Sequence, residues 1–450
     1  MMCGGDPMPF YVGAARANIT PPVGHRMSGY GNRTHGSDGI HDELRAKVLY
    51  VDDGTTRAVI AANDLLYLNA EAVAEVRRRV AEAAEVPAEN VFVCCSHTHG
   101  GPDTGYGEPS EDRMRAAYVE TLFYKIAGAA AEARRSALPA KMGRRRVETQ
   151  CGTNRRERTP DGRVILGRNL HGPVARFADV LRFDDAGTGR PLALLFSHAV
   201  HGTTLGGDNY LTTSELSGWA ERFAEAAFPG SVAMFCNGCA GDINPDPRGA
   251  FEHVDLLGTR LGAAVVGGAT QVEQMTEEVK VTCHLETAIL PVEDMPSLEA
   301  CRKEVAEAEA GLKALEGESS GRRWQPERRL RVARQMLAAA ESGQVDPGLP
   351  FEIQAVALND AALVGFPGEI FVEIGMEIER RSPFPRTLTI AYANGSLGYF
   401  PTAKEVPFGG YEIGIVRARH QGRVIKPEAD EAIIAGAVKV LKKTREKAGL

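Results

Sequence analysis

The stretch Ser96-His97-Thr98-His99 places two imidazoles one residue apart, directly after the short β-branched run 90–95. On an extended chain, side chains at i and i+2 point the same way, so the two rings would lie side by side at the end of a buried strand. Strand ends of α/β proteins are common places for metal and catalytic groups. The pair therefore indicates a metal site; the alternative is one hydrogen-bonded core histidine beside a solvent-facing one.

A second pair, His198 and His201, follows the apolar run 191–197. Residues three apart on a strand face opposite sides, so we expect only one of the two at a site. His201 precedes a glycine at the junction of strand and loop and is better placed. Neutral imidazole is a usual zinc ligand, so a second histidine-bearing strand end favours a metal.

Glu369 stands where the apolar run 361–366 meets the helical pattern 370–381. The pattern predicts that Glu369 lies in the first turn of this helix, where it could simply complement the helix dipole. As a partner of two histidines, it would instead complete a His₂Glu catalytic zinc site. Tyr399 and Tyr411 flank a Gly-rich loop, and nothing local distinguishes them from packing residues.

The cysteines do not suggest a second site. Eight of them in 450 residues are too few for a disulfide scaffold. Cys236 and Cys239 have CxxC spacing, but no second CxxC is present to complete a four-cysteine zinc site. We expect these two, together with Cys94 and Cys95, to be small buried hydrophobes.

Composition excludes some classes of partner. The chain has 52 Lys plus Arg against 59 Asp plus Glu, a formal charge of −7, which argues against nucleic acid. The basic run 144–146 is expected to be a solvated edge. No stretch is apolar for long enough to cross a bilayer, and the first residues lack a basic and then apolar leader. We therefore expect a cytoplasmic protein without stable membrane insertion.

Strand and helix patterns alternate along the chain. Strands are predicted at 44–53, 57–64, 90–95, 178–185 and 191–200, and helices at 71–86, 110–135, 217–228 and 252–267. This alternation predicts an α/β fold in which a mixed β-sheet core is layered with helices. Residues 136–175 lack periodicity and are expected to form a long surface loop.

Residues 297–343 differ from the rest in being rich in Ala, Glu, Lys and Arg. They predict an inserted helical hairpin that serves as a lid or an interaction arm. We expect residues 1–450 to form a single domain that carries this insertion.

Several blocks, in order over residues 10–295 and 350–415, resemble the catalytic domain of the neutral (neutral/alkaline, non-lysosomal) ceramidases, zinc-dependent amidases that cleave the N-acyl bond of ceramide. The blocks are VGAARANITPPVGHRMSGYG, SHTHGGPD, NRRERTP, VLRFDDAGTGRPLALLFSHAVHGTT, GCAGDINPD, FPGEIF and GYFPTAKEVPFGGYE. The resemblance implies four Zn²⁺ ligands: His97, His201, Glu369 and Tyr399. It also implies that His99 contacts substrate and that Tyr411 holds the scissile carbonyl.

By the same resemblance, four further residues are assigned to the site. Arg155 faces the substrate and Gly29 lines the pocket, while Asp242 and Asn244 belong to the block that contacts substrate. The family has Gly-Asp-Val-Ser-Pro-Asn where this chain has Gly-Asp-Ile-Asn-Pro-Asp, so Asn244 replaces a serine. An amide cannot act as a nucleophile, which leaves metal-activated water.

The resemblance and its departures predict a zinc-dependent amidase. Well-studied ceramidases are longer and carry a C-terminal immunoglobulin-like domain, which we expect to be missing here. An amide smaller and more soluble than ceramide is therefore expected as substrate. The alternatives are an esterase or cyclic-amide hydrolase at the same zinc site, or a non-catalytic binding protein that retains the fold. The expected partner is a small molecule, and a homo-oligomer is compatible with the sequence.

Overall fold

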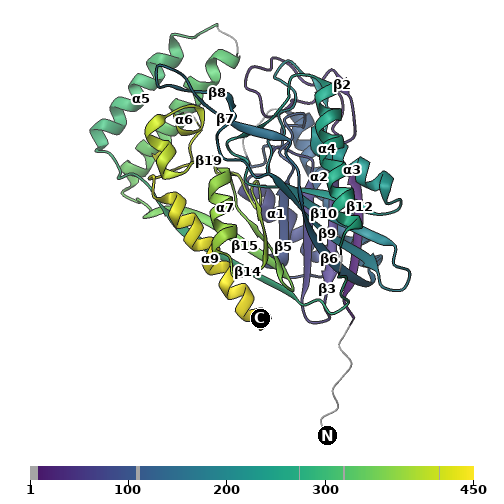
Figure 1. Cartoon of the computed structure of the whole chain (residues 1–450). Coiled ribbons are helices and arrows are strands. Elements are labelled where there is room, and N and C mark those ends of the chain that lie inside the picture. Colours follow the sequence, from purple (N-terminus) through teal and green to yellow (C-terminus); the bar gives the residue numbers. More distant parts are fainter. Residues whose placement is uncertain (1–8, 108–111, 273, 318–319, 415) are drawn as a thin grey trace.

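Two groups of four strands form the centre of the molecule (Figure 1). The computed structural model describes residues 9–107, 112–272, 274–317, 320–414 and 416–450. The first group contains β1 (Tyr11–Asn18), β3 (Arg45–Asp52), β4 (Arg57–Asn63) and β5 (Val91–Cys95). The second contains β6 (Leu138–Glu148), β9 (Phe177–Asp185), β10 (Pro191–His198) and β12 (Val232–Asn237). A short antiparallel pairing of β1 with β6 joins the two groups in the order β12-β10-β9-β6-β1-β3-β4-β5.

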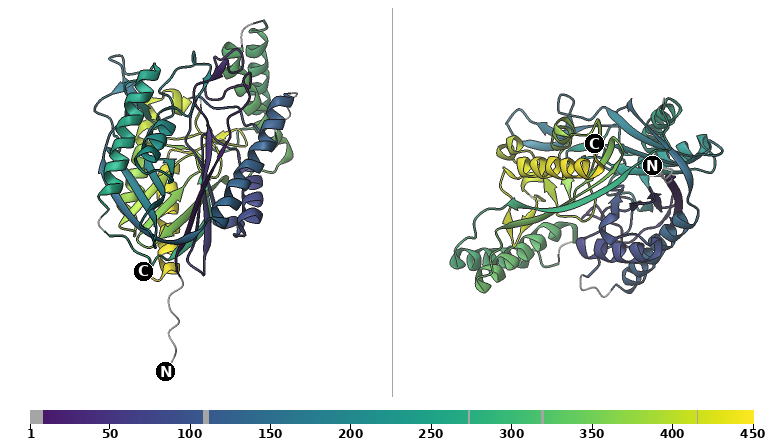
Figure 2. Two further views of the ribbon diagram at one scale, coloured as in Figure 1. Left: turned by 90° about the vertical axis from the view of Figure 1, so that its right-hand side faces the viewer. Right: turned by 90° about the horizontal axis from the view of Figure 1, so that it is seen from below.

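Apolar side chains from both groups meet in one core, which includes Leu49, Ile60 and Phe92 from the first and Leu195 and Met234 from the second. Helices cover the outer faces, as the left view of Figure 2 shows. α1 (Ala70–Ala84) and α2 (Arg113–Arg135) pack on the first group, and α3 (Glu215–Ala227) and α4 (Phe251–Thr270) on the second. The predicted α/β fold with a helix-layered mixed sheet is confirmed.

A third sheet holds β14 (Val281–Pro291), β15 (Gly348–Leu358), β16 (Ala361–Gly365) and β18 (Arg386–Ile390). α7 (Val372–Arg381) packs on β18, and α9 (Ala429–Ala448) packs on β14 and β15. Between β14 and β15 the chain forms α5 (Leu298–Lys313) and α6 (Ser320–Ser342), which project from the side of the molecule (Figures 1 and 2). The helical hairpin predicted at 297–343 is thus confirmed.

Short elements connect these layers. They are β2 (Gly39–Ile40), η1 (Ala88–Asn90), β11 (Leu211–Thr212), β13 (Ile243–Pro245), β17 (Glu369–Ile370), β19 (Tyr399–Phe400), η2 (Ala403–Phe408), α8 (Tyr411–Gly414), β20 (Arg419–His420) and β21 (Arg423–Val424). None of the helices in the described part of the chain combines the length and apolar composition needed to span a membrane.

The prediction of a long surface loop at 136–175 is wrong. This segment forms β6, β7 (Gly152–Arg158) and β8 (Val164–Asn169), and β6 pairs with β9 from Ala140 to Glu148. The prediction that residues 144–146 form a solvated edge is also wrong. Arg144 forms an ion pair with Asp360, and Arg146 forms one with Asp179. These carboxylates lie on other segments of the chain. The local sequence therefore shows only an irregular basic run, and the strand forms because of its tertiary pairing.

A fully buried ion cluster connects the two strand groups. Lys47 points inward from β3, and its Nζ lies 2.7 Å from Asp64 Oδ1 and 2.7 Å from Glu221 Oε1 on α3. Glu221 Oε1 also accepts a hydrogen bond from the Phe235 backbone N–H of β12. Because a buried charge without its partner is strongly unfavourable, this cluster tightly couples β3, α3 and β12.

Replacing the cation of this cluster should destabilise the whole protein. Lys47→Met leaves two carboxylates buried without their partner, and we expect it to lower the free energy of unfolding by about 3–5 kcal/mol in urea titrations. Arg78→Met is the control, since Arg78 pairs with Glu75 on the exposed face of α1. Equal stability losses in the two variants would contradict the structural role of Lys47.

Candidate metal centre

Four chain segments meet at one end of the sheets and present the predicted ligands. His97 follows β5, His201 follows β10, and Glu369 and Tyr399 are the first residues of β17 and β19. The two histidine segments are held together by the His99 N–H, which donates to Gly202 O at 2.9 Å. β17 and β19 are parallel, with Glu369 directly opposite Tyr399. The fold therefore brings together side chains from three distant parts of the chain, near residues 97, 201 and 369–399.

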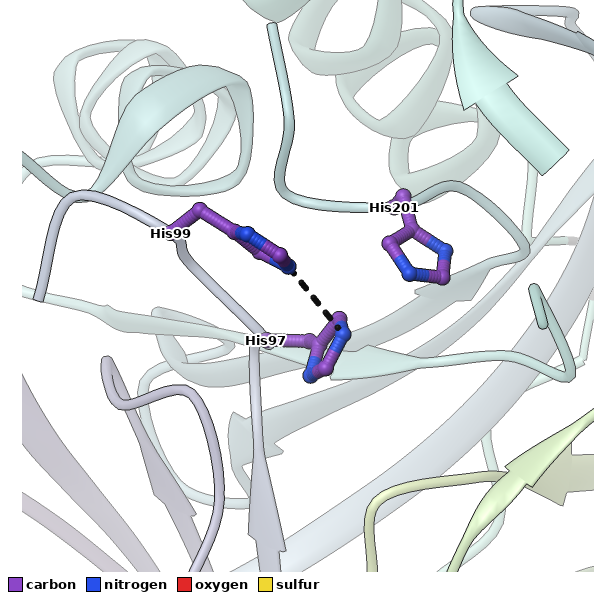
Figure 3. Close-up of side chains that lie close together, drawn as sticks. All are labelled: His97, His99 and His201. Carbon is purple, nitrogen blue, oxygen red and sulfur yellow. Dashed lines mark hydrogen bonds between the residues drawn. The ribbon is translucent and has the colours of Figure 1, made fainter. Parts of the chain in front are cut away.

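The prediction that His97 and His99 lie side by side is confirmed, since their Nε2 atoms are 3.4 Å apart (Figure 3). The assumption behind this prediction, that the backbone is extended through both histidines, is wrong. β5 ends at Cys95, and His97 has a φ of 62°, in the left-handed region. Backbone contacts maintain this conformation, because the His97 N–H donates to Leu65 O.

The prediction that Glu369 lies in the first turn of the helix is wrong. It belongs to β17, and α7 begins only at Val372. The Glu369 N–H donates to Gly398 O at 3.0 Å, which holds the residue in the parallel bridge with β19. This long-range pairing explains why the apparent helical pattern begins later than expected.

Two histidines present unprotonated nitrogens to one carboxylate oxygen. Nδ1 of His97 lies 2.9 Å from Leu66 O, and Nδ1 of His201 lies 2.7 Å from Ala240 O. A carbonyl only accepts, so each Nδ1 carries the proton and each Nε2 keeps its lone pair in the neutral ring. Burial, aided by the Arg155 guanidinium, lowers the pKa of His201 to about 3, which favours the neutral form.

The two lone pairs face Glu369 Oε2, at 3.2 Å from His97 Nε2 and 3.1 Å from His201 Nε2. This oxygen is buried and accepts no hydrogen bond from a described residue. Three electron-rich atoms at this spacing repel one another unless a cation lies between them. The donor set consequently fits a bound metal ion.

The spacing also fits zinc. Zn–N and Zn–O bonds near 2.0–2.1 Å in a tetrahedral arrangement separate the donor atoms by about 3.3 Å. The fourth predicted ligand obeys the same spacing, since Tyr399 Oη lies 3.2 Å from His201 Nε2. Two imidazoles, one carboxylate and one phenol oxygen are N and O donors that suit this metal.

His99 differs from the other two histidines. Its Nε2 belongs to the same cluster, in which the ligand atoms of His97, His99 and His201 lie within 4.8 Å of one another. Its Nδ1, however, is buried and has no hydrogen-bond partner among the described residues, so no carbonyl from them fixes its tautomer. Metal-bound histidines usually have such a partner on the other ring nitrogen. The geometry therefore favours a ring that is free to exchange hydrogen bonds.

Arg155 lies behind Tyr399 rather than in open space. It donates to Tyr399 Oη at 3.0 Å, to Asn244 Oδ1 at 3.2 Å and to Glu412 Oε1 at 2.7 Å. Asn244 also accepts from the Thr203 hydroxyl at 3.3 Å. These contacts make Arg155 the positioning residue of Tyr399, with Asn244 and Glu412 orienting its guanidinium.

The remaining predicted residues occupy different surroundings. The Tyr411 ring lies 5.9 Å from that of Tyr399, edge to face. A Cβ added at Gly29 would lie 2.4 Å from His99 Nδ1, so the glycine backbone borders the imidazole directly. Both carboxylate oxygens of Asp242 accept hydrogen bonds inside the protein, from Asn154 Nδ2 and the Val372 N–H.

His198 and the four cysteines left out of the predicted site lie in the core. His198 Nδ1 lies 2.7 Å from Phe177 O, its Nε2 accepts from the Cys151 N–H, and burial lowers its pKa to about 4. Cys236 does not face Cys239, because its sulfur lies 3.6 Å from that of Cys94 on the neighbouring strand group. The described cysteines are free, as expected.

Sequence reasoning missed three residues around the site. Tyr392, with a φ of 54°, stacks on His97 with ring centroids 3.9 Å apart. Tyr30 lies 4.9 Å from the His99 ring and donates to Leu205 O. Glu412 accepts from Arg155 and Arg156. Tyr30 follows the predicted residue Gly29, and Glu412 follows the predicted residue Tyr411, so proximity in the sequence could have indicated both. Nothing in the sequence indicated Tyr392.

Known proteins resemble this chain in sequence and in fold. A family model described as neutral/alkaline non-lysosomal ceramidase, N-terminal, matches residues 10–260. Neutral ceramidase A of Dictyostelium discoideum is 26% identical over 265 residues, which are 54% of this chain and 37% of that protein. Neutral ceramidase of Drosophila melanogaster is 24% identical over 302 residues, covering 58% and 40%. The aligned region thus spans about two-fifths of each relative.

Solved structures show the same fold. The crystal structure of neutral ceramidase from Pseudomonas aeruginosa superposes with a TM-score of 0.72 at 20% identity, covering 98% of this chain and 75% of that one. A structure named as ceramidase complexed with C2 gives a TM-score of 0.71 at 18% identity, covering 98% and 76%.

The contact of Gly29 with His99 can be tested by a matched pair of substitutions. Gly29→Ala places a methyl group against His99, whereas Gly24→Ala meets no atom within 4 Å although its φ of 88° is similar to the 97° of Gly29. We expect Gly24→Ala to cost about 1–2 kcal/mol from backbone strain and Gly29→Ala to cost more. Urea unfolding measures both, and adding His99→Ala to Gly29→Ala should remove the excess. Equal losses would contradict the predicted clash.

Proposed function

The chain belongs to the neutral/alkaline non-lysosomal ceramidase family, and we propose on this basis that it is a zinc-dependent hydrolase of a carbon–nitrogen amide bond. The observation that carries the proposal is the buried convergence of His97 Nε2, His201 Nε2 and Glu369 Oε2 at 3.1–3.2 Å. Tyr399 is the proposed fourth ligand.

Zinc at this point would polarise the scissile carbonyl and supply an activated water near neutral pH. The chain's own groups orient the substrate. His99, whose tautomer is not fixed by a carbonyl, donates a hydrogen bond to the oxygen on which negative charge develops. Tyr411 holds the same carbonyl from the side of Tyr399, and Gly29 leaves room for the His99 ring.

Asn244 supports the hydrolytic over the acyl-enzyme route. Its Oδ1 accepts from Arg155 and Thr203, so its amide keeps Arg155 directed at Tyr399. An amide side chain provides no nucleophile. We propose that the substrate is a small amide rather than ceramide in a bilayer, in which case the enzyme works on molecules in solution.

Metal content tests the proposed ligand assignment. Purified protein should bind about one zinc, and His97→Ala and His201→Ala should each reduce it below about half an equivalent, because a site with three ligands binds far more weakly. His99→Ala should retain zinc, as should His171→Ala, an exposed control on the chain. Metal is measured by elemental analysis after dialysis. If His99→Ala loses zinc as fully as His97→Ala, His99 is a ligand.

Turnover tests the role of His99. With zinc bound, His99→Ala should lower kcat for a short N-acyl amide such as N-octanoylethanolamine by about a hundredfold or more, as expected for loss of an oxyanion donor. Release of octanoate is followed by chromatography, with ceramide and octyl acetate as comparison substrates. Absence of amide cleavage by the zinc-loaded wild-type protein across N-acyl amines, N-acyl amino acids and ceramide would overturn the proposed function.

A further inference from the structure

Tyr392 contacts two of the proposed zinc ligands with its side chain and borders a third with its backbone. Its ring lies flat on the His97 imidazole, with centroids 3.9 Å apart and planes inclined by 19°. Its hydroxyl oxygen lies 3.5 Å from Nδ1 of His201, whose ring it meets edge to face. Its N–H donates to the carbonyl of Gly368, the residue before Glu369. A residue that is not itself a proposed ligand therefore adjoins three that are.

Hydrogen bonds to two strands hold Tyr392 in this position. The Cys95 N–H, at the end of β5, donates to Tyr392 O at 3.1 Å. The N–H of the preceding residue, Ala391, donates to Asn237 O at the end of β12, also at 3.1 Å. The ring of Tyr392 is therefore fixed relative to the backbone that leads from β5 into His97.

The backbone at Tyr392 is strained. Its φ of 54° lies in the left-handed region, which a large side chain adopts only at a cost in free energy. Asn394 has a φ of 60°, and both ends of its amide are held, since Oδ1 accepts from the Val93 N–H and Nδ2 donates to Gln354 Oε1. Such strain persists only where the surrounding structure maintains it, and it concentrates at functional sites. The fold thus maintains an unfavourable turn that directs the tyrosine ring towards His97.

The ring of Tyr392 limits the movement of the His97 imidazole. The hydrogen bond from Nδ1 to Leu66 O fixes one atom of the imidazole, which can still tilt about that atom. Stacking on Tyr392 covers one face of the imidazole and opposes this tilt. His97 Nε2 therefore stays directed at Glu369 Oε2, 3.2 Å away.

The hydroxyl of Tyr392 makes a weaker contact with His201. Nδ1 of this histidine donates to Ala240 O at 2.7 Å, whereas the hydroxyl oxygen is 3.5 Å away. Hydrogen bonds weaken with distance, so the carbonyl is the main partner of this N–H. The hydroxyl oxygen nevertheless lies beside the nitrogen that carries the proton, which favours the tautomer with a free Nε2. We therefore expect the aromatic ring to matter more than the hydroxyl.

We propose that Tyr392 is a positioning residue of the metal centre, whose ring holds the His97 imidazole in its zinc-binding orientation before the metal arrives. The inference rests on the proposed function and names a residue that sets the zinc affinity of that site. Ligands that are already oriented bind more tightly, because they need not be ordered when the metal binds. Tyr392 acts through His97 and His201 and is itself neither a ligand nor a catalytic residue.

Zinc affinity tests the proposal. Tyr392→Leu removes the aromatic ring, whereas Tyr392→Phe keeps the ring and removes the hydroxyl. We expect the dissociation constant for zinc to rise about 10- to 100-fold in Tyr392→Leu, the usual effect of losing a residue that orients a ligand. It should rise no more than about threefold in Tyr392→Phe, because the hydroxyl contact is long. Competition with the chromophoric chelator 4-(2-pyridylazo)resorcinol measures both constants.

Tyr50→Leu is the matched control, because Tyr50 is an equally buried tyrosine at the other end of the sheet. Tyr50 is 4% exposed and Tyr392 is 3% exposed. Tyr50 lies opposite Val59, which pairs with Val91 at the start of β5, whereas His97 follows the end of β5. Both leucine substitutions should lower the melting temperature, and only Tyr392→Leu should weaken zinc binding.

Tyr392→Gly is a second variant without the ring, because glycine adopts a positive φ freely and avoids any conflict of leucine with this backbone. It should weaken zinc binding as much as Tyr392→Leu does. Zinc binding of wild-type strength in a folded variant without the ring overturns the inference. An equal loss in Tyr392→Phe or in Tyr50→Leu also overturns it, since the effect would then come from the hydroxyl or from general destabilisation.

Metal-free protein separates failure of this inference from failure of the proposed function. If the wild-type protein binds no zinc, nuclear magnetic resonance with isotope-labelled histidine decides, and His97→Ala assigns the signals. In the wild type and Tyr392→Phe, we expect a single His97 tautomer with the proton on Nδ1 and ring protons shifted upfield by the stacked ring. The variants without the ring should lose the upfield shift and show broadened or mixed tautomer signals. A single, sharp Nδ1–H tautomer of His97 in those variants overturns the inference.

Discussion

One buried carboxylate oxygen, Glu369 Oε2, is the point on which the candidate metal centre converges. It faces the lone pairs of two imidazoles whose protons are held on the far side by backbone carbonyls of Leu66 and Ala240. A charged group in this position is strongly unfavourable unless an opposite charge compensates it. The surrounding fold, from the left-handed turn at His97 to the parallel bridge of β17 and β19, keeps these atoms at a distance where one small cation satisfies them all.

A second network connects this centre to the C-terminal third of the chain. Glu412 accepts hydrogen bonds from both Arg155 and Arg156, and Arg155 also donates a hydrogen bond to the Tyr399 hydroxyl. Glu412 adjoins Tyr411 on α8. The hydroxyl of Tyr399 is therefore held by one connected set of buried groups that includes Arg155 and Glu412.

Local sequence predicted those elements whose burial is periodic along the chain. The strand pair at 44–53 and 57–64 and the helices α1 to α4 follow from apolar spacing that a few neighbouring residues reveal, and the α5–α6 hairpin follows from its composition. β6 to β8 could not be predicted in this way. The arginines of β6 are matched by Asp360 and Asp179, and the backbone bonds of β6 and β7 are completed by β9 and β13, which are not neighbours in the sequence. β8 pairs with β7 across a short turn. The same limit applies to Glu369, whose short strand exists only because Tyr399 lies beside it.

The sequence by itself determined which residue types stand at the strand ends. It predicted a common site for His97 and His201, and it set His198 apart because residues three apart on a strand face opposite sides. It left out the cysteines because no second CxxC is present. The tertiary structure decided the tautomers of His97 and His201 and the surroundings of the His99 ring. Those depend on the carbonyls of Leu66 and Ala240, on the space left at Gly29 and on the Arg155 guanidinium, all supplied by segments far away along the chain. Hydrogen-bond partners of this kind have no local periodicity, so only the folded chain reveals why His97 and His99, two residues apart, differ.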